Sequence, residues 1–250
     1  MKFGLIGFGS LGRAFASALI HSGSAVGGDI YVCDFSPEAR TVAVSPPYNA
    51  YASDDVNEII EKSDVVFIVV KGYVFEELSK DIVRSGLAGK TVVSLMAGET
   101  FEDIYSLIGE VDLVRAMPSL AISVCDGVIA YTKSPPALAE IFNKFGFAFE
   151  TQPDIIEKVM AFSACGLGYA AYLIDAFAAA GEAMGFSTET AEHIAALSFK
   201  NAGDRGNFRD TVKQVATPGG ATEQGVTYMD KCDVYGIVAQ AIQRAYERMT

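Results

Sequence analysis

The stretch Phe3-Gly4-Leu5-Ile6-Gly7-Phe8-Gly9-Ser10-Leu11-Gly12 decides the fold at the start of this chain. An apolar run typical of a buried strand leads into a Gly-x-Gly-x-x-Gly pattern and then into an alanine-rich helical segment. In such a strand–turn–helix, Gly7 permits the tight turn, Gly9 lets the backbone approach a pyrophosphate, and Gly12 allows close packing of helix on strand. The sequence therefore predicts a dinucleotide-binding unit. Its predicted cofactor contacts in this loop are Gly7, Phe8, Gly9, Ser10, Leu11 and Gly12.

A second apolar run, residues 30–34, ends in Asp34, about 22 residues after Gly12. This is close to the spacing of the acid that hydrogen-bonds the ribose 2′-hydroxyl of NAD. Such an acid repels the 2′-phosphate of NADP, so we expect NADH or NADPH as cofactor, with NADH preferred because of Asp34. Ser36 and Arg40 follow closely and could cradle a phosphate if Asp34 turned away, which leaves NADPH open.

The composition of the chain argues against two classes of binding partner. The chain has 250 residues, half of them apolar and a fifth charged, with a formal net charge of −12. This charge does not attract nucleic acid or an anionic membrane, so we expect neither as a partner. No signal-peptide pattern is present, and the longest uncharged run, residues 159–174, is shorter than the roughly 18–20 residues of a membrane span. We expect a soluble, cytoplasmic protein.

The cysteines and histidines have no spacing typical of a metal site or a disulfide framework. They are scattered as Cys33, Cys125, Cys165, Cys232, His21 and His193. We therefore expect free thiols in a reducing compartment and no bound metal.

The chain is predicted to divide into an α/β part and a helical part. The predicted strands are residues 2–7, 30–34, 64–70, 91–95, 113–116, 127–131 and 147–150, and the predicted helices between them are 11–22, 56–62, 75–84, 101–108 and 136–144. Strands that are apolar throughout indicate a mostly parallel sheet covered on both faces. We assign an α/β fold, with an N-terminal Rossmann-type domain, residues 1–152, and an all-α C-terminal dimerisation domain, residues 153–250.

The second part contains only predicted helices. They cover residues 154–165, 168–185, 187–201, 207–215, 222–231 and 235–249. The helix at 168–185 is apolar around most of its circumference, so it must be buried. About 100 residues can barely enclose it alone, and we therefore expect a second subunit to cover it.

The corner Thr217-Pro218-Gly219-Gly220-Ala221-Thr222 lies between two predicted helices. Proline ends the preceding segment, two unrestricted glycines follow, and Thr222 can open the next helix. Several backbone N–H groups and one hydroxyl then point at a common spot, which suits a small carboxylate. The alternative is an ordinary helix–turn–helix corner.

These motifs together resemble the pyrroline-5-carboxylate reductase family over essentially the whole chain. The resemblance rests on Ile6-Gly7-Phe8-Gly9-Ser10-Leu11-Gly12, on the strand ending Val69-Val70-Lys71, on Arg115-Ala116-Met117-Pro118, on a helix start at residues 163–169, and above all on the Pro-Gly-Gly-x-Thr corner. It implies reduction of the C=N bond of 1-pyrroline-5-carboxylate to give proline, by a homodimer or assembly of dimers formed through the C-terminal helices.

The resemblance also implies roles for individual residues. The substrate carboxylate would bind the N–H groups of Gly220, Ala221 and Thr222, while the Thr222 hydroxyl, the candidate catalytic group, would hold the imine nitrogen or pass a proton. Thr222 of a neighbouring subunit would complete the site. The remaining implied substrate contacts are Ser163 and Gly219, and the remaining cofactor contacts are Val70, Lys71, Ala97, Gly98, Met117 and Pro118.

Three departures from the family pattern leave the substrate open. Gly72 stands where the family usually has proline, Ser119 where it has asparagine, and residues 163–169 replace the family's Ser-Gly-Ser-Gly-Pro-Ala-Tyr segment. The alternatives are a reductase of another small cyclic imine carboxylate and a catalytically silent NAD(P)-binding paralogue. A 3-hydroxyacid dehydrogenase is disfavoured because residues 163–185 contain no lysine, and a deazaflavin-dependent reductase because it lacks the corner.

Overall fold

The computed structural model describes residues 1–249, which form two compact units. The first unit is Met1–Ala164 together with the end of the chain from Arg248, and the second is Cys165–Glu247. The units therefore divide within the helical region, after the last strand has ended. The assignment of residues 1–152 and 153–250 to two domains stays a prediction.

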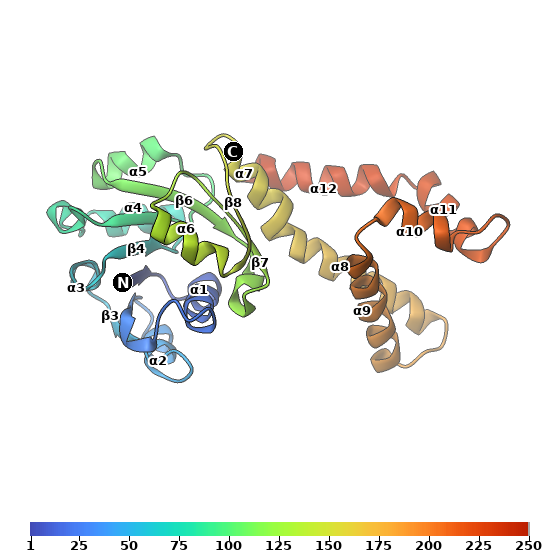
Figure 1. The fold of residues 1–250 in the computed structure, drawn as a ribbon, viewed down its shortest axis with the longest axis horizontal. Helices are drawn as coiled ribbons and strands as arrows, with labels where there is room; N and C mark the ends of the chain where they lie inside the picture. The colour runs from blue at the N-terminus through green and yellow to red at the C-terminus, as the bar shows by residue number, and fades with distance from the viewer. Residues whose placement is uncertain (250) are drawn as a thin grey trace. The chain divides into compact units, whose positions relative to one another are not determined.

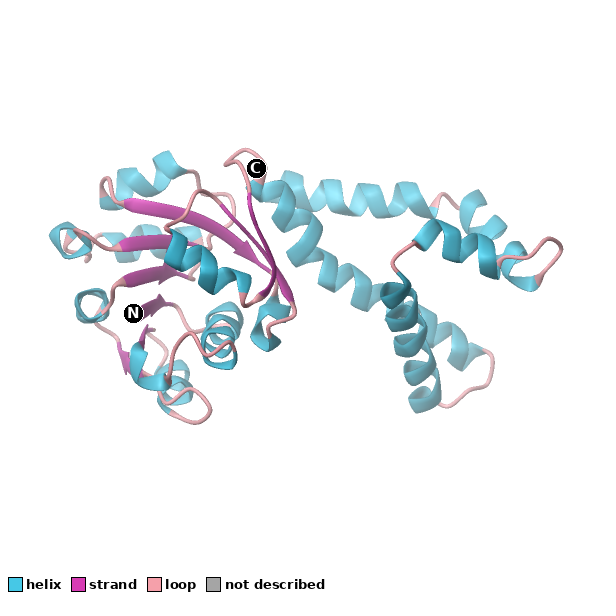
Figure 2. Ribbon diagram, in the orientation of Figure 1, coloured by secondary structure: helices cyan, strands magenta, loops and turns pink. Residues whose placement is uncertain are grey.

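An eight-stranded sheet forms the centre of the first unit (Figures 1 and 2). Its strands lie in the order β3-β2-β1-β4-β5-β6-β7-β8. All neighbouring strands run parallel except β6 and β7, which confirms the mostly parallel sheet. The bounds are β1(Phe3–Ile6), β2(Ile30–Cys33), β3(Tyr51–Ser53), β4(Val65–Ile68), β5(Thr91–Ser94), β6(Asp112–Pro118), β7(Gly127–Tyr131) and β8(Gly146–Glu150).

Apolar residues on both faces of the sheet produce two separate hydrophobic cores, because successive strand residues point to opposite faces. Leu5 belongs to one core and Ile6 to the other, as do Phe67 and Ile68 of β4. Helices α1(Ser10–His21), α2(Pro37–Val44) and α6(Pro136–Asn143) contribute to the first core. Helices α3(Val56–Lys62), α4(Gly72–Ser79) and α5(Phe101–Ile108) contribute to the second.

Two elements of the first unit, helix α2 and strand β3, were not predicted. Ser36 caps α2 by accepting a hydrogen bond from the Ala39 N–H at 3.2 Å, and Pro37 stands at its first position. Strand β3 is a three-residue edge strand with an exposed Tyr51, so it lacks the apolar run that marks a buried strand. Short 3₁₀ segments η1(Gly27–Asp29), η2(Arg84–Leu87) and η3(Leu120–Val124) join other elements, and α4 begins and ends earlier than predicted.

After β8, the secondary-structure elements of the described residues are all helical, as predicted. Residues 154–165 contain α7(Ile156–Val159) and the π-helical turn η4(Met160–Ala164), which belong to the first unit. The second unit contains α8(Cys165–Ala183), α9(Thr188–Arg205), α10(Phe208–Val215), α11(Ala221–Lys231) and, up to Glu247, α12(Val234–Met249).

Helix α8 is less buried in the described chain than its composition requires. Of its residues only Ala178 is buried, in a small cluster with Ala191 and Ala195 of α9. Large apolar side chains of α8, including Tyr172 and Phe177, are exposed. By length and composition alone, the helical run Ile156–Ala183 would be long and apolar enough to cross a membrane. The burial predicted for residues 168–185 is therefore not supplied by the single chain.

Candidate active site

The glycine loop after β1 has the geometry that the motif predicts. Gly7 has φ +105°, a conformation that favours glycine, and an added Cβ there would lie 2.8 Å from Val70 Cγ1. A Cβ on Gly12 would collide with the carbonyl oxygen of Gly7, so glycine is needed for the helix to pack on the turn. A Cβ on Gly9 would meet nothing within 4 Å. The loop thus offers open backbone at the start of α1, as a pyrophosphate requires.

The topology brings the other predicted cofactor residues to the same edge of the sheet. Strand β1 lies between β2 and β4, so the chain reverses its direction across the sheet beside the glycine loop. Ligands of open α/β sheets bind at such switch points, outside the carboxyl ends of the strands. Asp34 follows β2, and the half-buried Val70 and exposed Lys71 follow β4. Lys71 is the N-cap residue of α4, with no side-chain cap hydrogen bond.

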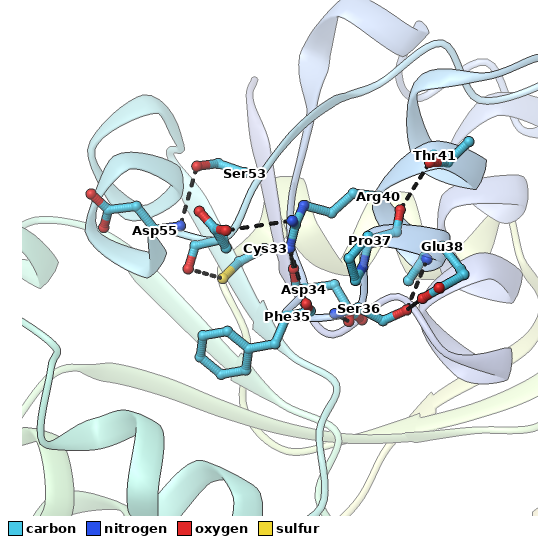
Figure 3. A network of polar contacts seen from close by, with 12 residues as sticks. Cys33, Asp34, Phe35, Ser36, Pro37, Glu38, Arg40, Thr41, Ser53 and Asp55 are labelled. Carbon is cyan, nitrogen blue, oxygen red and sulfur yellow. Dashed lines mark hydrogen bonds and ion pairs between the residues drawn. The ribbon is translucent and has the colours of Figure 1, made fainter.

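Asp34 is bound to the glycine loop itself. Its Oδ1 accepts a hydrogen bond from the Ser36 N–H at 2.9 Å (Figure 3). Its Oδ2 accepts one from the Phe8 N–H at 2.7 Å. A carboxylate has about four acceptor positions, so each oxygen can still accept a hydroxyl. The donors and acceptors at this edge therefore fit a dinucleotide with a free ribose.

The remaining predicted cofactor contacts differ in exposure. Met117 and Pro118 are buried within β6, paired with Ala130 and Ile129 of β7. Gly98 has φ +77°, and an added Cβ would lie 2.7 Å from the carbonyl oxygen of Met249. Met249, which belongs to the first unit, thus makes the close approach at Gly98.

Next to these residues lies a buried ion pair that sequence reasoning missed. Arg115 of β6 donates to Glu157 of α7 and to the Met96 carbonyl oxygen at 2.9 Å. The Arg115 Nη2 lies 2.5 Å from the Glu157 Oε1, and the Arg115 and Glu157 side chains are 4% and 14% exposed. Burial raises the pKa of the nearby Glu99 carboxyl, with Asp103 adding to the effect and Arg115 opposing it. The signal available in the sequence was an arginine inside an otherwise apolar strand.

Ser163, a predicted substrate contact, lies in η4 with its hydroxyl buried and without a hydrogen-bond partner among the described residues. It lines an apolar groove of the first unit. The other residues of this groove are Val128, Phe147, Phe149, Ile155, Lys158, Val159 and Phe162. An unpartnered buried hydroxyl is uncommon in a folded protein, so a ligand or water is expected beside Ser163.

In the second unit, the Pro-Gly-Gly corner is built as a tight turn onto α11. Gly219 has φ +75°, and the Gly220 N–H closes the turn by donating to the Thr217 carbonyl oxygen at 2.8 Å. The expectation that this N–H binds substrate is therefore wrong for the described structure. The first helical turn still leaves the N–H groups of Ala221 and Thr222 without an intrahelical acceptor, and both residues are exposed.

Glu223 is a further feature of the corner that sequence reasoning missed. Its Oε2 accepts a hydrogen bond from the Gly219 N–H at 2.7 Å. A carboxylate of the chain itself thus already binds one N–H of the corner. A second carboxylate at Ala221 and Thr222 would lie near this negative charge.

Two departures from the family pattern have a structural explanation. Ser119 is buried and holds η3 to β7, because its Oγ accepts from the Val128 N–H at 3.0 Å and its own N–H donates to the Val128 carbonyl at 2.8 Å. At Gly72 a Cβ would collide with the carboxylate of Glu99. A proline at position 72 would require Glu99 to move. Among the described residues, no group of His, Cys, Asp and Glu side chains could hold a metal ion.

Both parts of the sequence match profiles of known protein families, and the whole chain matches known proteins. A profile described as pyrroline-5-carboxylate reductase dimerisation matches residues 153–250, and one described as NADP oxidoreductase coenzyme F420-dependent matches residues 2–98. The pyrroline-5-carboxylate reductase of Aquifex aeolicus (strain VF5) is 28% identical over 262 residues, covering 99% of this chain and 96% of that protein. The Escherichia coli (strain K12) enzyme of the same name is 27% identical over 260 residues, with the same coverage.

The fold has a close counterpart among solved structures. Plasmodium falciparum pyrroline carboxylate reductase, crystallised with NADP bound, superposes with a TM-score of 0.89 and covers 100% of this chain and 97% of its own. Its sequence identity is 19%, so this likeness concerns the fold. Through its C-terminal part and through these full-length relatives, the chain is similar over its whole length to the pyrroline-5-carboxylate reductases.

Proposed function

We propose that this protein is an NAD(P)H-dependent pyrroline-5-carboxylate reductase, an oxidoreductase that reduces the C=N bond of 1-pyrroline-5-carboxylate to give proline. The observation that supports the proposal is full-length similarity to the family combined with the glycine loop, in which Gly7 has a positive φ, Gly12 packs against Gly7 and Gly9 has open space around it. The hydride comes from the reduced nicotinamide when the cofactor is bound. The chain's own residues orient the reactants and stabilise their charges.

The first unit would hold the cofactor. The open backbone of Gly9 and the start of α1 would receive the pyrophosphate, and Asp34 would accept the hydroxyls of the adenosine ribose. The β4 and β5 ends, at Val70, Lys71, Ala97 and Gly98, would flank the rest of the dinucleotide. Met117 and Pro118 would support this edge from within β6, since both are buried.

The second unit would hold the substrate carboxylate. The free N–H groups of Ala221 and Thr222, at the N-terminus of the 11-residue α11, would bind it. The Thr222 hydroxyl would hold the imine nitrogen or an attached water, because a threonine hydroxyl alone is too weak an acid to supply the proton. Gly219 and Gly220 would shape the corner, and the unpartnered Ser163 hydroxyl would offer a further contact.

The chain would act as a homo-oligomer. Its second unit matches a dimerisation profile, and this unit exposes large apolar side chains that a single chain leaves uncovered, among them Tyr172, Leu173 and Phe177. Pairing through the C-terminal helices would bury them. We place this homodimer, or an assembly of such dimers, in the cytoplasm, without a nucleic-acid or membrane partner.

The main alternative is a reductase of another small cyclic imine carboxylate. It is favoured by the altered residues 163–169 and by Glu99, whose carboxylate lies against Gly72 where the family usually has proline. A catalytically silent paralogue is the second alternative, and the retained Thr222 argues against it.

The test is the oxidation of NADH and of NADPH, followed at 340 nm with pyrroline-5-carboxylate, by the wild type, Thr222→Ala and Thr227→Ala. Thr227 is exposed on the same helix and serves as the matched control. We expect turnover that Thr222→Ala lowers by at least tenfold and that Thr227→Ala leaves unchanged. Cofactor binding without oxidation by the wild type would exclude the proposed reaction and direct the search to other cyclic imines.

A further inference from the structure

Arg40, in helix α2 after the end of β2, is an arginine that could meet a 2′-phosphate, but its guanidinium is bound to other groups. The Arg40 Nη1 donates to the carbonyl oxygens of Asp34 at 2.7 Å and of Phe35 at 3.1 Å (Figure 3). Its Nη2 lies 3.4 Å from Asp54 Oδ2. Asp54 is 67% exposed, so this ion pair contributes little, and the two carbonyl groups mainly hold the guanidinium.

Ser36, the second candidate for a phosphate contact, is also engaged. Its Oγ accepts the Ala39 N–H at 3.2 Å as the N-cap of α2 and donates to Glu38 Oε2 at 2.7 Å. Binding a phosphate would require Ser36 to give up the capping arrangement that starts α2, and would bring the phosphate towards the Glu38 carboxylate. Neither polar side chain that follows Asp34 is therefore free for a phosphate.

Asp34 itself is held in the orientation that a free ribose requires. The Phe8 N–H donates to one of its oxygens and the Ser36 N–H donates to the other. Turning the carboxylate away, as a 2′-phosphate would demand, breaks both hydrogen bonds. One of them anchors the glycine loop between Gly7 and Gly9, so the rearrangement would also disturb the expected pyrophosphate contact.

The charges around this point are predominantly negative. Burial is the main cause of the raised pKa of the Cys33 thiol; the nearby carboxylates of Asp34, Asp55 and Asp54 raise it further, and Arg40 opposes them. Three negative charges therefore face one positive charge at the end of β2. A 2′-phosphate would add up to two more negative charges there, whereas a ribose hydroxyl adds none.

We propose that this chain selects NADH over NADPH, with Asp34 as the selecting residue and Arg40 held by the Asp34 and Phe35 carbonyl groups instead of serving as a phosphate ligand. The inference deepens the proposed function, on which it rests for the identity of the cofactor. It assigns Arg40 a role in fixing the β2–α2 turn. An arginine at position 40 therefore does not indicate NADPH, because its guanidinium is bound to carbonyl groups of the chain.

The test measures dissociation constants of NADH and NADPH by cofactor fluorescence, without any imine, so that it reads binding independently of turnover. For the wild type we expect NADH to bind at least tenfold more tightly. In Asp34→Ser the preference should fall by at least tenfold. Asp34→Asn, which keeps an oxygen to accept the Phe8 N–H, serves as a second variant if Asp34→Ser does not fold.

Arg40→Gln separates the proposed role from that of a phosphate ligand. We expect the affinities for NADH and NADPH to change by the same factor, within about twofold, because the side chain supports the turn. Asp126→Asn, an exposed carboxylate after η3, makes the same change in net charge as Asp34→Asn and should leave the preference unchanged.

Two results would overturn the inference. One is a wild type that binds NADPH as tightly as NADH, and the other is an Arg40→Gln variant that loses NADPH affinity alone. A wild type that prefers NADH but reduces no pyrroline-5-carboxylate would leave this inference standing and remove the proposed function.

Discussion

Arg115 and Glu157 form a buried ion pair that joins strand β6 to helix α7, the first helix after the sheet. Arg115 also donates to the carbonyl oxygen of Met96, two residues after β5, so one guanidinium joins β6, the segment after β5 and a helix. Its Nε and the Glu157 Oε2 have no partner among the described residues. The pair thus supports the edge of the sheet where the cofactor is proposed to bind.

Removing one member of this pair should be strongly destabilising, because it leaves the other charge buried without compensation. We expect Glu157→Ala to lower the free energy of unfolding by about 3–5 kcal/mol. Urea denaturation measures this change. The control is Glu77→Ala, which breaks the exposed Lys80–Glu77 pair and should have no measurable effect. Equal, small effects of the two substitutions would show that the buried pair does not hold the edge.

Substitutions of the loop glycines should affect NADH binding and the stability of the fold to different extents. An added methyl group at Gly9 meets no atom within 4 Å, so we expect Gly9→Ala to keep the melting temperature while weakening NADH binding at least tenfold. Gly12→Ala should lower both, since its Cβ collides with the Gly7 carbonyl. Gly28→Ala, also in open space but in η1, is the control for binding. Unchanged NADH affinity in Gly9→Ala would place the pyrophosphate elsewhere.

Glu223 should weaken the binding of a carboxylate substrate, because its own carboxylate is bound to the Gly219 N–H in the corner. We expect Glu223→Gln to lower the KM for pyrroline-5-carboxylate several-fold, with a smaller change in kcat. Asp230→Asn removes the same charge near the other end of α11 and should leave the KM unchanged. A raised KM in Glu223→Gln would instead identify Glu223 as a group that shapes the corner for the substrate.

The Cys33 thiol should be inert in the folded protein. Burial, aided by the nearby carboxylates, raises its pKa to about 12, and the thiolate is the reactive form. We expect Ellman's reagent to modify the exposed Cys232 in the native protein and Cys33 only after unfolding. Rapid native modification of Cys33, located by peptide mapping, would contradict this expectation.

The same pKa predicts a loss of stability in alkali. The unfolded thiol loses its proton near its ordinary pKa of 9.0 and the folded thiol only near 12, so the unfolded state binds fewer protons between these values. The contribution of Cys33 to stability is therefore complete below about pH 9 and declines as the pH rises towards 12. Urea denaturation of the wild type and Cys33→Ala at pH 8 and pH 10.5 measures it. The difference in unfolding free energy between the two proteins should shrink at the higher pH.

The exposed apolar face of α8 should be buried in an oligomer. We expect light scattering to give at least twice the mass of one 26.6 kDa chain. The double substitution Leu173→Glu and Phe177→Glu should release monomers, because charges cannot be buried unpaired in the interface. Tyr73→Glu, on α4 of the first unit, replaces a similarly exposed apolar residue and should leave the mass unchanged. A monomeric wild type would refute the proposed assembly.

Much of the fold could be predicted because its signals are local. Helix α5 and strand β7 begin and end at the predicted residues, since their apolar periodicity is continuous and their ends are marked by Thr100 or glycine. Strand β3 and helix α2 escaped prediction because an exposed three-residue edge strand and a short helix with few buried residues carry little hydrophobic pattern.

In the candidate site too, local features could be predicted from the sequence and contacts between distant residues could not. The roles of Gly7, Gly9 and Gly12 follow from a fixed spacing within one turn, which the sequence states directly. The partners of Asp34, Arg40, Arg115 and Glu223 do not, because a hydrogen bond depends on where the side chain and its neighbour lie in space.

The sequence by itself determined most of the strands and helices along the chain, the dinucleotide-binding loop and the resemblance to the family. These depend on backbone propensities and on glycine positions a few residues apart. Only the tertiary structure decided that Arg40 is held by two carbonyl groups, that Gly220 closes its own turn, and that Arg115 meets Glu157 across 42 residues of chain. Each contact joins groups that only the folded chain brings together. How much it contributes to the free energy of folding depends on the burial of those groups, which a short stretch of sequence does not reveal.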